Sequence, residues 1–77
     1  MSRATEIAQL ADEAAPAIVI VFNGAHLRKL GTLPAAEVTT GDAIRPVVDS
    51  LLLRGGYTCT YVSISEALGR RCVIAHG

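Results

Sequence analysis

Residues 17–22 read Ala-Ile-Val-Ile-Val-Phe, six apolar residues in a row that are followed by an Asn-Gly pair. Four of the six are β-branched, and such side chains pack well on a pleated sheet and are stiff in a helix. The segment therefore predicts a strand, and a strand without a polar face is normally buried on both sides.

Burial on both sides is hard to arrange in a chain of 77 residues, because helices on one side of a thin sheet leave the other side in water. Either Val19 and Val21 or the alternating set Ile18, Ile20 and Phe22 needs a cover. We expect a second copy of the chain to provide it, through an interface at Val19 and Val21 with Tyr61 nearby. The apolar share of 51% supports such an interface, since a small monomer must show many residues to water.

The balance of charges disfavours nucleic acid and anionic lipid as partners. Seven basic residues balance seven acidic ones, so no long-range attraction draws the chain to nucleic acid or to anionic lipid. Six of the basic residues are arginines, and Lys29 is the only lysine, which indicates GC-rich codon usage or, alternatively, arginines selected for bidentate contacts to anions. Nucleic acid is further disfavoured because the aromatic residues are only Phe22, Tyr57 and Tyr61.

Length and cysteine content indicate one domain over residues 1–77 in a reducing compartment. The first sixteen residues lack the apolar core of a leader, and no apolar run is long enough to span a membrane. Cys59 and Cys72 are too few for a secreted disulfide scaffold. We therefore expect a cytoplasmic protein without a membrane partner.

The first half of the chain predicts a helix, a strand and one ambiguous segment. Helical spacing of apolar residues marks 3–14, with Ser2 as N-cap and Pro16 beyond the end. After the strand at 17–22, the Asn-Gly pair favours a two-residue hairpin turn with a returning strand at 25–30. The alternative is a short helix over 24–30, which Asn23 would cap.

The second half predicts a helix over 43–54, capped by Asp42, with Pro46 in its first turn. Its apolar face is Val47, Val48, Leu51 and Leu52, and two glycines end it.

A strand follows at 57–64, then one helical turn at 64–68, then a strand at 71–76. The link between these strands is too short for a parallel crossover, so they are expected to be antiparallel. The fold class is therefore α+β, with two helices packed on a small, mostly antiparallel sheet of three or four strands.

Two groups of basic residues are candidate ligand-binding positions. His26, Arg28 and Lys29 follow the apolar strand, and Arg70 and Arg71 lie beside the last loop. If the two loops share an edge of the sheet, they form a positive rim that suits a phosphate or carboxylate. The alternative is that these residues are ordinary solvated loop positions.

Metal binding and catalysis have weak signals. If residue 64 lies opposite 71, Cys59 faces His76, but the cysteine and histidine spacing matches no zinc signature. Ser63 and Ser65 have no histidine at a recognisable spacing, although His26 could approach them in the fold. We expect no metal, no cofactor and no catalytic residue.

These observations together predict a small non-catalytic module that associates with itself, as a homodimer, or with another protein. A domain that binds a small anionic ligand at the basic rim is the first alternative, and a subunit of an enzyme completed by a partner is the second.

Overall fold

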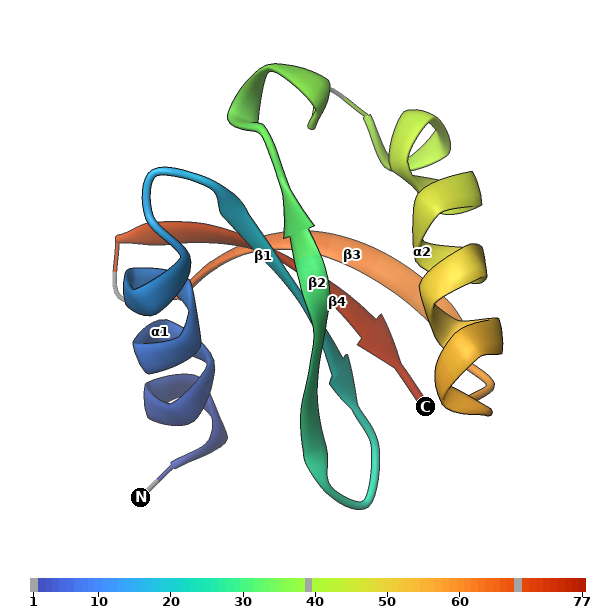
Figure 1. Cartoon of the computed structure of the whole chain (residues 1–77). Helices are drawn as coiled ribbons and strands as arrows, with labels where there is room; N and C mark the ends of the chain where they lie inside the picture. The colour runs from blue at the N-terminus through green and yellow to red at the C-terminus, as the bar shows by residue number, and fades with distance from the viewer. Residues whose placement is uncertain (1, 39, 68) are drawn as a thin grey trace.

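The chain forms a four-stranded sheet with one helix on each face (Figure 1). The computed structural model describes residues 2–38, 40–67 and 69–77. This is the α+β class predicted from the sequence. The elements in chain order are helix α1 (Arg3–Ala14), strands β1 (Ile18–Asn23) and β2 (Leu27–Leu33), the 3-10 turn η1 (Ala35–Glu37), helix α2 (Gly41–Gly55), and strands β3 (Tyr61–Ala67) and β4 (Arg70–His76).

The sheet is mixed, with the strand order β2-β1-β4-β3. Two antiparallel hairpins, β1/β2 and β3/β4, are joined side by side through the parallel pair of β1 and β4 at the centre. The predicted antiparallel pairing of the last two strands is confirmed. The predicted helical turn at 64–68 is wrong for residues 64–67, which continue β3, and residue 68 lies outside the described residues.

Helix α1 has the predicted bounds and cap, because the Ser2 side chain accepts a hydrogen bond from the Thr5 backbone N–H at 3.2 Å. Helix α2 begins earlier than predicted. Its N-cap is Thr40 rather than Asp42, and Pro46 therefore lies in the second turn.

Helix α2 ends as predicted at its glycine pair. Gly56 adopts a left-handed φ of 73° that other residues rarely accept, and its N–H reaches the Leu53 carbonyl.

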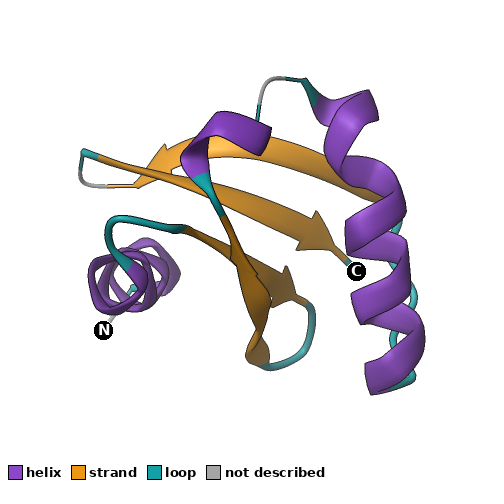
Figure 2. Ribbon diagram, turned by 45° about the horizontal axis from the view of Figure 1, so that its top comes forward, coloured by secondary structure: helices purple, strands orange, loops and turns teal. Residues whose placement is uncertain are grey.

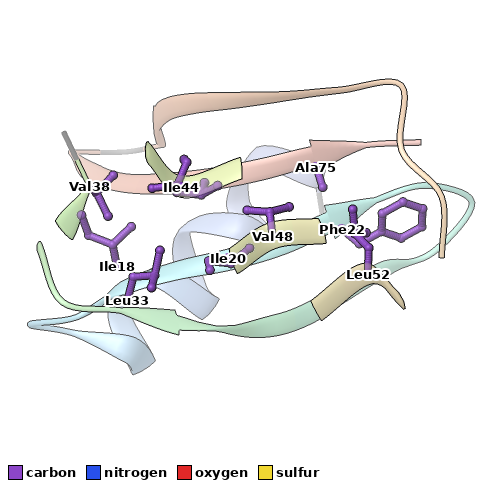
Figure 3. Close-up of a cluster of buried hydrophobic side chains, with 10 residues drawn as sticks. Ile18, Ile20, Phe22, Leu33, Val38, Ile44, Val48, Leu52 and Ala75 are labelled. Carbon is purple, nitrogen blue, oxygen red and sulfur yellow. The ribbon is translucent and has the colours of Figure 1, made fainter. Parts of the chain in front are cut away.

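Both faces of β1 are covered by helices of the same chain. Helix α1 packs Ile7 and Ala11 over one face, which includes Val19 and Val21, and α2 covers the other (Figure 2). The core between the sheet and α2 contains alternating β1 residues, three α2 residues and side chains that neighbour them. Figure 3 labels nine of its residues, Ile18, Ile20, Phe22, Leu33, Val38, Ile44, Val48, Leu52 and Ala75.

This arrangement corrects the expected interface at Val19 and Val21. Both side chains are fully buried beneath α1, so no second copy is needed to cover them. The expectation assumed that both helices lie on one side of the sheet, whereas each covers a different side. The double burial of the apolar strand was inferred correctly, but its cause is internal.

Strand β2 contains a bulge that its sequence explains. Leu27, Leu30 and Leu33 are three residues apart, so regular alternation would send Leu27 and Leu33 to one face and Leu30 to the other. The register shift between Ile20 and Val21 leaves Leu30 as the extra residue, and both Leu30 and Leu33 then pack on the α2 side while Leu27 packs on the α1 side.

The hairpin alternative for residues 24–30 is thus confirmed, with a wider turn than the predicted two residues. Asn23 pairs with Leu27, so three residues, 24–26, connect the strands. The short helix over 24–30 is excluded, because residues from Leu27 onward belong to β2.

Two adjacent leucines of α2 test this packing. Leu52 is 4% exposed and Leu53 is 83% exposed. We expect Leu52→Ala to lower the free energy of unfolding by about 2–5 kcal/mol, since it leaves a cavity in the core. Leu53→Ala should change it by no more than about 0.5 kcal/mol. Urea unfolding followed by circular dichroism measures both, and equal losses would contradict the placement of α2.

Candidate functional site

The two predicted groups of basic residues lie at opposite ends of the sheet. Strands β1 and β4 run parallel, with Asn23 beside His76, so the turn that holds His26 follows the end of β1. Arg70 and Arg71 stand at the beginning of β4. Through Phe22 and Val21 of β1, Arg28 and Lys29 lie level with Ala75 and Ile74 of β4, three to four residue steps or about 10–13 Å along the strands from Arg71, and β1 lies between β2 and β4. The structure therefore does not bring the five basic residues into one rim.

Each group is a surface feature on its own. His26, Arg28 and Lys29 are exposed at and beside the β1/β2 turn. The Arg70 Nε donates to the Asp12 carboxylate at 2.7 Å, which ties the beginning of β4 to α1.

Arg71 lines an open hollow of about 280 Å³ at the end of the sheet where β1 and β4 begin, together with Glu66 and small residues that include Pro16 and Ala35. Arg70 also lines it but is paired with Asp12, and Glu66 lies opposite Arg71 in the hairpin, so the lining carries little surplus positive charge.

A polar cluster on the β3/β4 hairpin is the group that sequence reasoning missed. Tyr61, Ser63, Ser65 and His76 alternate along the two strands and share the α1 face near the β3 edge; we call them the polar strip. The Ser63 hydroxyl and the His76 Nε2 share a hydrogen bond of 2.9 Å, and the two serine hydroxyls are 3.5 Å apart. The Tyr61 and His76 rings stack with centroids 4.3 Å apart.

The register of the hairpin determines this cluster. Tyr61 lies opposite His76 and Ser65 opposite Cys72, two residues away from the register with 64 opposite 71. The histidine near the serines is thus His76 and not His26. The signal that could have identified it is Gly69, whose φ of 83° marks the turn and thereby sets the pairing.

A serine bonded to an imidazole is the arrangement of a nucleophile and its base. Within the described residues, however, the ring hydrogen bond found for His76 is the one to Ser63, and Ser63 and His76 do not line the three best-formed hollows of the surface. The geometry favours a hydrogen-bonded surface layer over a catalytic pair.

The two cysteines are on different sides of the sheet. Cys72 is buried on the α1 side and its thiol donates to the Ser65 carbonyl at 3.4 Å. Cys59 lies before β3 and packs against the core beneath α2. The cluster of Cys59, Cys72 and His76 considered from the sequence is therefore not formed, and the described residues contain no group of three metal-ligating side chains.

Burial raises the pKa of the Cys72 thiol above its ordinary value, and the nearby Glu66 carboxylate adds to the rise. The folded protein thus holds this proton at a pH where the unfolded chain releases it.

The two edges of the sheet differ. On β2, the bulge at Leu30 and the exposed side chains of Arg28 and Lys29 interrupt the edge. Strand β3 pairs with β4 in seven consecutive positions without a bulge and carries Tyr61 at 54% and Ile64 at 37% exposure. Natural sheets protect their edges with charged side chains, above all lysines, and with prolines and bulges; β3 contains no lysine, proline or bulge, and its one charged residue, Glu66, is the second-last of the strand.

Comparison with protein-family models, with curated proteins and with solved structures finds no match to this chain. No helix in the described part of the chain is long and apolar enough to cross a membrane.

Thiol labelling tests the placement of the cysteines. Cys59 is half-buried and Cys72 is buried, so we expect one thiol per chain to react with a maleimide in the folded protein and both to react in urea. Mass spectrometry of the labelled peptides identifies the site. Labelling of Cys72 in the folded protein at the rate of Cys59 would contradict its burial under α1.

The raised pKa of Cys72 predicts a loss of stability in alkali. Above the ordinary thiol pKa the unfolded chain binds fewer protons than the folded chain, so the free energy of unfolding falls as pH rises. We expect the fall from about pH 8 to pH 10 to be smaller in Cys72→Ala than in the unchanged protein. Cys59→Ala, which keeps Cys72, is the control and should retain the larger fall in urea unfolding.

Proposed function

We propose that this chain is a small non-catalytic interaction module that associates with its own copy through the free edge of β3. The observation that carries the proposal is the contrast between the two sheet edges. Strand β2 has the features that prevent edge pairing, a bulge and two exposed cations, and β3 has neither.

The backbone of β3 offers the binding groups. In an antiparallel pair with β4, alternate N–H and C=O groups of β3 point away from the sheet. A strand from another molecule can accept and donate hydrogen bonds there, which is the mode of recognition by strand addition. Seven residues in extended conformation present a ladder of ordinary strand length.

The side chains of β3 favour a protein partner. Tyr61 is more than half exposed, and tyrosine is enriched at the centres of protein interfaces. Ile64 is exposed on the opposite face, where Val62 is partly buried against the α2 core. A neighbouring strand would remove apolar surface from water on both faces of the edge.

A second copy is the partner that these features fit. The net charge is zero, so two copies do not repel one another. A copy also supplies a free strand of the same length and character, and most soluble oligomers are symmetric assemblies of one chain. The support for self-association is thus the β3 edge and no longer the covered face at Val19 and Val21.

Two variants, each with one lysine introduced on a different edge of the sheet, test the proposal. We expect the unchanged protein to show twice the chain mass of 8.0 kDa by light scattering after size exclusion. Ile64→Lys places two like charges in the interface and should raise the dissociation constant about tenfold or more. Thr32→Lys places the same charge on the β2 edge and should leave the dimer intact.

Circular dichroism of both variants confirms that they fold. A monomer at micromolar concentration for the unchanged protein, or equal loss of the dimer in both variants, would contradict self-association through β3.

A further inference from the structure

We infer that the two copies pair in one defined register, with the two-fold axis of the dimer passing through Ser63. This inference rests on the proposed self-association and specifies its geometry. A dimer interface of this kind is isologous, so if residue i of one copy lies opposite residue j of the other, j also lies opposite i. One residue therefore lies opposite the same residue of the other copy, and naming that residue defines the register.

The pleat of β3 restricts the symmetry axis. A two-fold axis parallel to the strands would make the two β3 strands parallel and place each residue beside the same residue of the other copy. The side chains of these two residues would then point to opposite faces, which a pleated sheet does not allow. The axis must therefore be perpendicular to the sheet, with the two β3 strands antiparallel. The polar strips of both copies then lie on the same face of the joined sheet. Residues opposite one another in antiparallel strands have their side chains on the same face, so they are an even number of positions apart in the sequence. The axis therefore passes between the two copies of one residue, and we say that it passes through that residue.

The charge and the apolar residues of β3 select Ser63 as that residue. With Ser63 on the axis, Val62 of each copy lies opposite Ile64 of the other, so apolar surface meets apolar surface twice. Tyr61 then lies opposite Ser65, and residues 61–65 pair within the strand on both copies. Glu66 falls opposite Thr60, beyond the apolar pairs.

The neighbouring registers are poorer. An axis through Ile64 would set each Glu66 carboxylate against an apolar Val62, and an axis through residue 65 would set it against Ile64. An axis through Val62 would keep only residues 61–63 of β3 in the ladder and leave Ile64 opposite Thr60.

This register also joins the two polar strips. The two Ser63 residues, each bonded to its own His76, meet at the axis, and Tyr61 of each copy lies beside Ser65 of the other. The α1 face of the dimer thus has a continuous hydroxyl-rich and aromatic floor over the two β3 strands, with His76 of each copy beside it. Neither copy forms this floor alone.

Single cysteines test the register, in a Cys59→Ser background that retains the buried Cys72. Paired residues in antiparallel strands have Cα atoms about 4.5–5.5 Å apart, which a disulfide can bridge. Ser63→Cys should therefore form a disulfide-linked dimer under mild oxidation. Thiols held together react at an effective concentration on the order of millimolar, so at about 10 μM protein the bond should form about 100-fold faster than in Ser65→Cys.

A mixture of Tyr61→Cys and Ser65→Cys chains provides a second test that leaves Ser63 and its hydrogen bond unchanged. We expect a mixed disulfide in that mixture and little disulfide in either chain alone, measured by mass spectrometry and on non-reducing gels.

The outcomes separate the register from the function. A dimer by light scattering that crosslinks through Val62→Cys or Ile64→Cys, and not through Ser63→Cys or the mixture, overturns the register and leaves self-association standing. A protein that stays monomeric, with no fast crosslink at any of these positions, overturns both.

Discussion

The fold depends on the parallel pairing of β1 with β4 at the centre of the sheet. All other strand pairs are hairpins between neighbours in sequence, but this pair joins the first half of the chain to the second. Because a central parallel pair is apolar on both faces, it requires a cover on each side. Helix α1 covers the side of Val19 and Cys72, and α2 covers the side of Ile20 and Val73.

The assignment of the helices to opposite faces explains how so short a chain buries so apolar a strand. The five buried residues 18–22 of β1 divide between two small cores rather than one. The surplus of apolar residues in the composition is therefore mostly accounted for inside one chain. What remains on the surface is concentrated at a few positions, of which Tyr61 and Ile64 lie on the β3 edge.

Much of the fold could be predicted from local sequence, because its determinants are local. The cap at Ser2, the end of α2 at its glycines and the strand at 17–22 each follow from a few adjacent residues. Which face of the sheet each helix covers could not be predicted, because α1 and α2 have similar apolar stripes and neither stripe indicates a face of the sheet. The bulge at Leu30 was hidden for a related reason: it becomes visible only against the register of its partner strand.

The candidate site shows the same division. The exposure of Tyr61 and of the basic residues could be anticipated, but the meeting of Ser63 with His76 depends on a hairpin register that shifts with the choice of turn. Likewise, the five basic residues are separated by the parallel direction of β4, a long-range property that no local pattern encodes. The exposure of a site residue was therefore easier to predict from the sequence than the residues that it contacts in the fold.

The joining of two hairpins by one central pair also has a consequence for the order of folding. Each hairpin closes a short loop, whereas the β1/β4 contacts, such as Val19 with Cys72, bring together residues more than fifty positions apart. Contacts distant in sequence form late, because their loop entropy must be overcome before they add stability. The two α-β-β halves can thus take shape separately, and their docking along β1 and β4 is the step in which the molecule becomes cooperative.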